Sequence, residues 1–235
     1  MIKNIVIIGS GNVASHLAPA LHGAGIEIVQ VYSRRITRAR KLAKQVNAQP
    51  INQLSAITLT ADLYLFVITD TAVADVAKAL TQQVNLPKTA LFAHTSGATP
   101  ITVFKGIVKR YGIFYPLQTF TKGKPINFST IPFCIDGNQK TIRKNLTTLA
   151  QLLSPNVTHL SDTQRAHLHV AAVFANNFTN HLFTISEKLL AEQGLSFDLL
   201  RPLILETALK VQDQSPADMQ TGPARRGDEA TIGRH

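Results

Sequence analysis

Glycines and small residues near the N-terminus have the spacing of a phosphate-binding turn. The segment Gly9-Ser-Gly-Asn-Val-Ala14 matches the pattern G-x-G-x-x-A and follows an apolar run. Gly9 permits a tight turn from strand to helix, Gly11 lets a pyrophosphate approach the backbone, and Ala14 lets the helix pack closely on the strand. The free N–H groups at the helix N-terminus would bind the phosphates. The segment therefore predicts a dinucleotide site that includes Gly9, Ser10, Gly11, Asn12 and Val13.

Basic residues stand where this kind of site usually carries an acid. In an NAD site, an Asp or Glu at the end of the second strand bonds the ribose 2′-OH. Here Ser33-Arg34-Arg35 follows the apolar segment Ile26–Tyr32. Guanidinium groups present a planar set of donors to phosphate oxygens, which an acid would repel. Ser33, Arg34 and Arg35 therefore predict NADP as the cofactor, and the alternative is a solvated basic start of a helix.

Three polar segments directly follow apolar runs, and these runs are expected to be neighbouring strands. The segments are Thr69-Asp70-Thr71, His94-Thr-Ser-Gly97 and Tyr115-Pro-Leu-Gln-Thr119. In open α/β sheets the ligand lies beyond the carboxyl ends of the strands. We therefore expect the first segment to contact the cofactor through Thr69 and Asp70, and the others to contact the substrate through His94, Ser96, Gly97 and Gln118. The alternatives are that Asp70 caps a helix and that His94 bonds a neighbouring loop.

A largely apolar helical stretch after residue 160 carries histidines and asparagines. At 3.6 residues per turn, His169, Asn176 and Asn180 fall within about 40° of one another. A polar stripe in an apolar helix is costly unless its members find partners, so it is a candidate site lining. His169 would exchange a proton with the substrate, which Asn176 or the catalytic candidate Asn177 would orient. The alternative is a solvated stripe, and the spacing fits no metal motif.

The C-terminal segment Gln220–Asp228 contains a pair of arginines between glycines. Arg225 and Arg226 would suit an anionic substrate, because guanidinium groups bind carboxylates and phosphates well. The alternative is a mobile basic loop.

Strand and helix patterns alternate through the first part of the chain, which indicates an α/β fold with a mostly parallel sheet. Helices are expected at 37–46, 71–83, 99–110 and 139–153, the second of them capped by Asp70 or Thr71. After Ser161, Asp162 would cap a long helical stretch to about Gln193, and a second helix would follow Ser196. The tail from Ser215 reads as irregular. We predict a dinucleotide-binding domain at 1–155 and a small all-α domain at 156–235.

Composition and charge exclude several classes of protein. Of 235 residues, 45% are hydrophobic and 16% are charged, which indicates a folded core. The lone Cys134 excludes an internal disulfide framework. The net charge of +10 is spread thinly, and no nucleic-acid-binding pattern accompanies it. No apolar stretch is long enough to span a membrane, and the first strand starts too early for a signal peptide, so we expect a cytoplasmic protein.

Five motifs together resemble a known family. They are Gly9–Ala14, His94–Gly97, Tyr115–Phe120, His169–Phe178 and Thr221–Asp228. The chain resembles Rossmann-like proteins described as proposed NADP oxidoreductases that carry a C-terminal helical domain of unknown function. The resemblance covers essentially the whole chain, and its last two motifs are the specific ones.

The resemblance implies a fold similar to that of pyrroline-5-carboxylate reductase and the β-hydroxyacid dehydrogenases, whose helical domain commonly dimerises. The dehydrogenases use a Lys on the first long helix of that domain, with an Asn a turn later. This chain has no Lys between Thr163 and Asn180, which leaves His169 as the substitute. Members of the family usually continue into another helix beyond Asp228, which this sequence lacks.

The sequence thus predicts an NADP-dependent oxidoreductase that moves a hydride between nicotinamide and a C=O or C=N bond of a small anionic substrate. It also predicts a homodimer formed through the helical domain, with no nucleic acid, membrane or metal involved. The rival hypotheses are an NADP-binding sensor or assembly subunit without turnover, and a deazaflavin-linked reductase.

Overall fold

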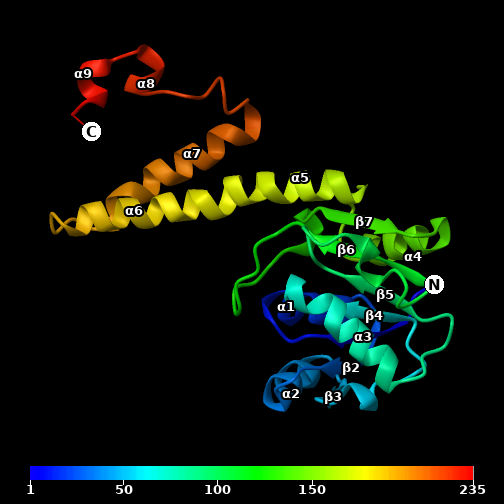
Figure 1. Ribbon diagram of the computed structural model, residues 1–235. Helices are drawn as coiled ribbons and strands as arrows, with labels where there is room; N and C mark the ends of the chain where they lie inside the picture. The colour runs from blue at the N-terminus through cyan, green and yellow to red at the C-terminus, as the bar shows by residue number, and fades with distance from the viewer. Residues whose placement is uncertain (235) are drawn as a thin grey trace. The chain divides into compact units, whose positions relative to one another are not determined.

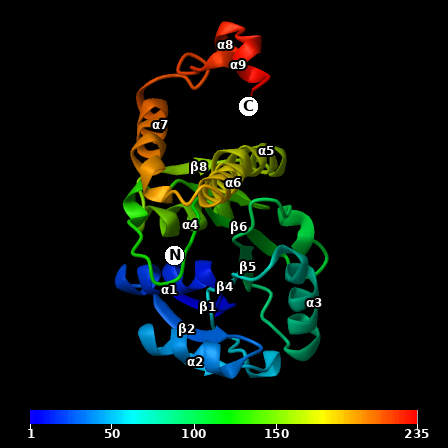
Figure 2. The ribbon, with the colours of Figure 1, turned by 90° about the vertical axis from the view of Figure 1, so that its left-hand side faces the viewer.

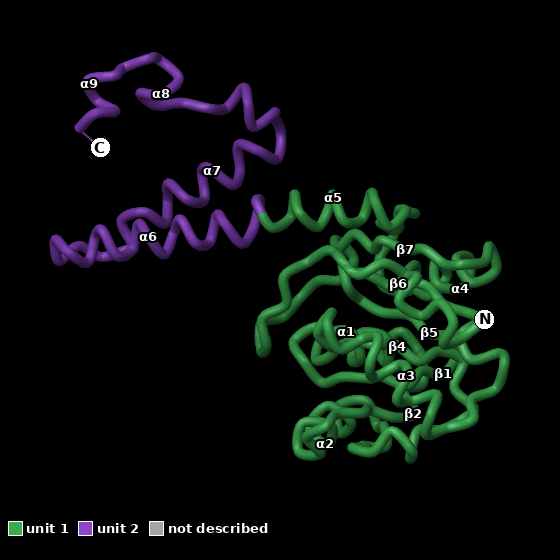
Figure 3. Tube along the Cα trace, in the orientation of Figure 1, with its two compact units in different colours: residues 1–173 green, residues 174–235 purple. Residues whose placement is uncertain are grey.

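The chain forms two compact units in a computed structural model that describes residues 1–234. The first unit is Met1–Val173 and the second is Phe174–His235 (Figure 3). Both β8 and the helix that follows it belong to the first unit, whereas the sequence placed the domain boundary between residues 155 and 156. Those domain limits stay a prediction.

An eight-stranded sheet forms the centre of the first unit (Figure 1). The strand order is β3-β2-β1-β4-β5-β6-β7-β8. All neighbouring strands are parallel except β6 and β7, which are antiparallel. The strands are β1 (Asn4–Ile8), β2 (Glu27–Tyr32), β3 (Gln49–Ile51), β4 (Leu63–Phe66), β5 (Leu91–His94), β6 (Arg110–Pro116), β7 (Phe133–Gly137) and β8 (Val157–His159). This is the predicted α/β fold with a mostly parallel sheet.

Helices cover both faces of the sheet, as Figures 1 and 2 show. Ile5 and Ile7 of β1 pack against one face together with α1, α2 and α4 residues, while Val6 and Ile8 pack with α3 against the other. Both faces of a parallel sheet are buried in this way, so its strands are almost wholly apolar. The helices of this unit are α1 (Asn12–Gly23), α2 (Ile36–Gln45), α3 (Val73–Gln83), α4 (Lys140–Gln151) and α5 (Asp162–Ala172), with short 3₁₀ helices η1 (Leu54–Ala56), η2 (Asp70–Ala72), η3 (Ile101–Phe104) and η4 (Phe128–Thr130).

Two local predictions for this unit were wrong. The helix expected over 99–110 is only the 3₁₀ turn η3, because Gly106 has a φ of +82° and Arg110 already begins β6. The edge strand β3 was missed, since it has three residues and contains Pro50. Gln30 of β2 fixes this edge by donating a side-chain hydrogen bond to Gln49.

The second unit is helical and has almost no interior of its own. A π-helical segment (η5, Val173–Phe178) begins at the end of the first unit, and α6 (Thr179–Ala191), η6 (Phe197–Leu200) and α7 (Arg201–Asp213) follow. No residue of α6 or α7 is buried. Ser196 caps η6, as predicted. The tail was wrongly predicted to be irregular, since it contains α8 (Pro223–Arg226) and α9 (Glu229–Ile232).

Candidate functional site

A groove of about 810 Å³ lies at the carboxyl ends of β1, β2 and β4. Gly9 makes the turn from β1 to α1 with a φ of +128°, and a Cβ there would lie 2.0 Å from the Val67 carbonyl oxygen. A Cβ on Gly11, in contrast, would meet no atom within 4 Å. Only glycine therefore fits at the turn, and the groove is open where a pyrophosphate would approach the backbone.

Every residue predicted to bind the cofactor except Asp70 lines this groove. Ser10 and Ser33 hold its two sides together, because the Ser10 hydroxyl donates to the Ser33 hydroxyl at 2.9 Å. Arg34 and Arg35 are exposed at the same end, and no acidic residue lines the groove. The α1 N-terminus also carries no acid and no side-chain cap. These residues fit the phosphates of a dinucleotide.

Asp70 forms the start of η2 beyond the edge of the groove. Neither it nor Thr71 caps the following helix with its side chain, so the predicted capping role was wrong. Asp70 lies close enough to Tyr115 that its charge helps raise the pKa of that phenol.

The loop after β5 is held by His94 and Ser96, both of which are buried. The Ser96 N–H donates to His94 Nδ1 at 3.2 Å, and the Ser96 hydroxyl accepts from the Ala98 and Thr99 N–H groups. Burial and the nearby Arg165 charge lower the pKa of His94 to about 4. His94 is therefore neutral near pH 7, and with Nδ1 accepting, its proton lies on Nε2.

His169 meets this loop from α5. Its Nδ1 lies 3.3 Å from the Tyr115 hydroxyl, and a Cβ on Gly97 would lie 2.5 Å from the same nitrogen. Burial is the main cause that raises the pKa of Tyr115 to about 12, so its hydroxyl keeps its proton and shares a hydrogen bond with Nδ1 of His169. The structure brings together the predicted residues His169 and Gly97 with Tyr115.

His167, two residues before His169 on α5, makes a different contact. It is exposed, and its Nδ1 donates to the Thr163 carbonyl oxygen at 2.8 Å.

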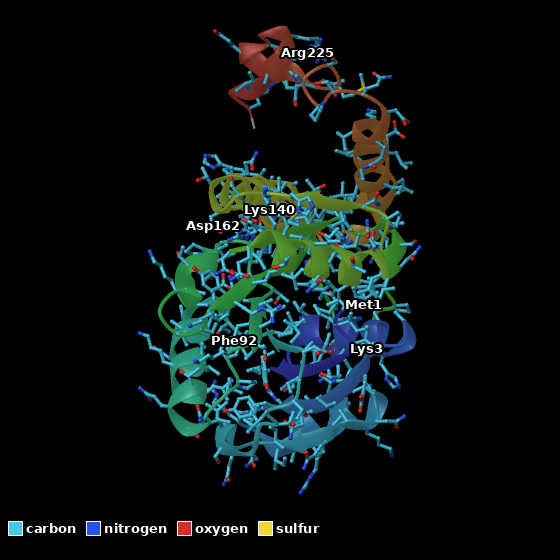
Figure 4. The ribbon with its side chains drawn as sticks, turned by 90° about the vertical axis from the view of Figure 1, so that its right-hand side faces the viewer. Met1, Lys3, Phe92, Lys140, Asp162 and Arg225 are labelled. Carbon is cyan, nitrogen blue, oxygen red and sulfur yellow. The ribbon has the colours of Figure 1, made fainter. Side chains whose placement is uncertain are left out.

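Arg165, which sequence reasoning missed, joins α5 to the loop after β5. Its side chain is fully buried, its Nη2 lies 2.8 Å from an Asp162 carboxylate oxygen, and it donates to the Thr99 carbonyl. Asp162, labelled in Figure 4, accepts from the Ile101 N–H at 3.1 Å. Nε and Nη1 of Arg165 have no hydrogen-bond partner in residues 1–234. A sequence signal existed, because Arg165 precedes His169 by four residues and so shares its helix face.

The start of α5 also corrects a prediction. Ser161, not Asp162, is the N-cap, and with Gln164 it forms a capping box. Asp162 is the first residue inside the helix, where its carboxylate is free to bind Arg165 and Ile101.

Within residues 1–234, no hydrogen bond or salt bridge joins the side chains of the remaining predicted residues to this cluster. Gln118 is exposed and its side chain accepts from the Thr119 N–H. Asn176 and Asn177 are exposed in the π-helical segment. That segment has wider, i→i+5 turns, whereas the predicted alignment of His169, Asn176 and Asn180 assumed regular α-helical turns; the alignment stays a prediction.

The arginine pair lies in the second unit, on α8. Arg225 donates to the Asp218 and Gln220 carbonyls at 2.9 and 2.6 Å, which fixes the turn before α8. Arg226 is exposed on the same helix. Neither a group of three or more metal-ligating side chains nor a helix that could cross a membrane occurs among the residues described.

Comparisons with known proteins match both parts of the chain. Residues 2–118 match the model of a Rossmann-like domain, and residues 131–235 match a domain of unknown function, DUF2520. A solved structure of a proposed NADP oxidoreductase from Bacteroides fragilis is 42% identical, covers 100% of this chain and 90% of its own, and superposes with a TM-score of 0.92.

The chain belongs to the family of Rossmann-like proteins with a DUF2520 domain. Other solved structures show the fold alone. A Thermotoga maritima protein is 22% identical over 98% of this chain and 87% of its own, with a TM-score of 0.75. A Plasmodium falciparum pyrroline carboxylate reductase with NADP bound is 12% identical over 99% and 93%, with a TM-score of 0.64.

One curated relative matches a short part of the chain. A glutamyl-tRNA reductase from Geobacillus kaustophilus is 37% identical over 65 residues, which are 27% of this chain and 14% of that protein.

Proposed function

We propose that this protein is an NADP-dependent oxidoreductase that transfers a hydride between nicotinamide and a C=O or C=N bond of a small anionic substrate. The observation that carries the proposal is the groove over Gly9 and Gly11, which is open at the glycine turn and basic at its Ser33–Arg35 end. The name of the Bacteroides fragilis relative supports the same activity. The cytoplasmic location predicted from the sequence stays a prediction.

The groove residues would hold NADP in a fixed orientation. The Gly11 backbone and the α1 N-terminus would bind the pyrophosphate, since both offer free N–H groups and no acid opposes them. The hydroxyl of Ser33 and the guanidinium groups of Arg34 and Arg35 would bind the 2′-phosphate. Thr69 and Thr95 line the groove after β4 and β5, on the way from the glycine turn to the loop at Gly97.

His169 is the proposed proton donor and acceptor. When NADP is bound, its nicotinamide supplies or receives the hydride. We assign the Tyr115 hydroxyl as the donor to Nδ1 of His169, which would fix the ring and leave an Nε2 proton for the substrate oxygen or nitrogen. Arg165 acts behind this pair as a positioning residue, because it ties the helix that carries His169 to the Thr99 backbone.

The substrate contacts are proposed for groups from several segments. The Ser96–Gly97 turn lies beside His169 and would offer a backbone N–H to a substrate carbonyl or carboxylate. His94 is fully buried, so it would act mainly by holding this turn. The roles of Asn176, Asn177, Gln118, Arg225 and Arg226 stay predictions.

The cofactor assignment is tested by titrating NADPH and NADH into wild type and into the Arg34→Ala/Arg35→Ala double variant. Each lost charge-assisted bond is worth roughly 1.5–3 kcal/mol, which is tenfold or more in affinity. NADPH affinity should fall at least that much while NADH affinity barely moves. Equal losses for both cofactors would remove these residues from the 2′-phosphate site.

We also propose that the helical unit pairs with a second copy of the chain. Several large apolar side chains on α6 and α7 are 42–62% exposed, and this unit buries too little apolar surface to be stable alone. They are Leu182, Ile185, Leu189, Leu203, Leu205, Leu209 and Val211. Covering such faces with the same faces of another copy gives a closed two-fold dimer. Sedimentation at micromolar concentration should show a dimer, and a monomer would refute the proposal.

A further inference from the structure

A second cavity, of about 610 Å³, lies next to the cofactor groove. Ser10 and Arg38 line both cavities, so the two share a wall. The further lining comes from α1, from α2 and from the loop between β6 and β7, which runs beside α1 in Figures 1 and 2. We refer to this space as the loop cavity.

The loop cavity is basic throughout. Arg38 and Lys41 face it from α2, and Lys122 and Lys124 face it from the loop. Its other polar lining residues are hydroxyl, imidazole or amide side chains, namely Ser10, Ser15, His16, Thr37 and Gln45, and no carboxylate lines it. None of the four cations makes a salt bridge within residues 1–234. Like charges held together in this way repel one another, so an anion in the cavity would relieve that cost.

The loop has a defined conformation, which fixes where its lysines lie. His16 Nε2 donates to the Thr121 carbonyl oxygen at 3.0 Å, and the His16 ring packs on Phe120 with centroids 5.7 Å apart. The Lys124 N–H closes a turn to the Thr121 carbonyl at 3.1 Å, with Gly123 at a φ of +82° in the position that requires it. Lys122 and Lys124 therefore flank a tight turn that α1 anchors, and they are not part of a loose tail.

We propose that the loop cavity binds a phosphate monoester. Four cations, with the Thr37 hydroxyl and the Gln45 amide as further donors, suit the negative charge and the three acceptor oxygens of a phosphate dianion. This phosphate could come from two sources. One is the 2′-phosphate of NADP, reaching into the cavity past Ser10 and Arg38, and for this source the inference rests on the proposed function. The other source is a phosphorylated small molecule that binds beside the cofactor.

The test removes the loop lysines and measures phosphate binding without any turnover. Calorimetric titrations of inorganic phosphate and 2′-AMP compare wild type with the Lys122→Ala/Lys124→Ala variant. They are done at low ionic strength, because salt screens exposed charges. The matched control is Lys105→Ala/Lys144→Ala, which removes the same charge from exposed lysines that line neither cavity. Far-ultraviolet circular dichroism checks that all variants are folded.

We expect the loop variant to lose at least tenfold in affinity for phosphate or 2′-AMP while the control stays within about twofold, since one charge-assisted bond accounts for tenfold. If NADPH displaces phosphate, and the loop variant weakens NADPH but not NADH, the source is the cofactor. If phosphate still binds the NADPH-saturated protein, the source is a separate ligand.

The proposal is overturned if wild type and loop variant bind phosphate and 2′-AMP equally, or if the control variant loses as much as the loop variant. The proposed function would be refuted by different results, namely that the protein does not bind NADPH or does not turn over a substrate. Because the phosphate titrations need neither cofactor nor substrate, the two failures are distinguishable.

Discussion

Asp162 and Arg165 form an ion pair whose two members should differ sharply in their effect on stability. The Arg165 side chain is fully buried, whereas that of Asp162 is 33% exposed. In Asp162→Ala, the guanidinium group stays buried with only the Thr99 carbonyl as a partner. Breaking a buried pair so that one charge is left uncompensated costs about 3–5 kcal/mol. For a chain of this size, that loss lowers Tm by about 6–20 °C.

The opposite change should be far milder. Arg165→Met removes the buried charge and keeps an apolar side chain of similar length. Asp162 can then hydrate and still accept from Ile101, so the loss should be about 1–2 kcal/mol, mainly for the unpaired Thr99 carbonyl. The double variant should resemble Arg165→Met, because it no longer contains a buried unpaired charge. Asp162→Ala is thus expected to be rescued by a second substitution.

Urea unfolding at a fixed protein concentration measures the three free energies of unfolding. The control is Asp136→Ala, which breaks a pair of similar length, 3.0 Å, but leaves an Arg143 side chain that is 44% exposed and can hydrate; it should therefore cost less than Asp162→Ala. The reasoning is refuted if Arg165→Met costs more than Asp162→Ala, or if the double variant is less stable than Asp162→Ala.

Two further predictions use the same kinds of measurement. His94 has a pKa of about 4 in the folded protein, below its value of 6.5 in the unfolded chain. Between these pH values the unfolded state therefore binds more protons than the folded state. The free energy of unfolding should fall as the pH drops from about 6.5 to 4, by up to about 1.4 kcal/mol per pH unit. His94→Asn, which can keep the acceptor for the Ser96 N–H, should flatten this slope in urea titrations, and an unchanged slope would contradict the assignment. Gly11→Ala should leave Tm unchanged, because its Cβ would meet no atom within 4 Å. It should nevertheless weaken the binding of NADPH and NADH alike, because the methyl group fills the pyrophosphate position. Unchanged affinity for both would place the cofactor elsewhere.

The sequence predicted the elements whose signals are local. The apolar run before Gly9 and the glycine spacing defined β1, the turn and α1, because each of those residues has a direct steric task. The segment 99–110 was mistaken for a helix, since its apolar spacing fits η3 but Gly106 ends the turn. Periodicity alone does not separate one helical turn from three.

The sequence indicated which residue types form the candidate site, but it indicated less well which of these residues contact one another. His169 and Gly97 are 72 positions apart in the sequence, and only the fold shows that they touch. Arg165 was missed because an arginine near a helix start ordinarily points to solvent. Its burial depends on Asp162 and on the Thr99 carbonyl from a distant loop. The π-helical turn at Val173–Phe178 also has no signal in a spacing rule for α-helices.

The central claim is that the protein oxidises or reduces a substrate with NADP through His169. The most direct measurement follows NADPH absorbance in the near ultraviolet while pooled small carbonyl and imine acids are added to wild type and to His169→Gln. The account predicts oxidation by wild type, a rate reduced about 10²–10⁴-fold in the variant, and equal NADPH affinity for both. Oxidation of NADPH only when a deazaflavin is supplied would favour a deazaflavin-linked reductase. Tight binding of NADPH without its oxidation by any pool would contradict the claim and favour a sensor or assembly subunit.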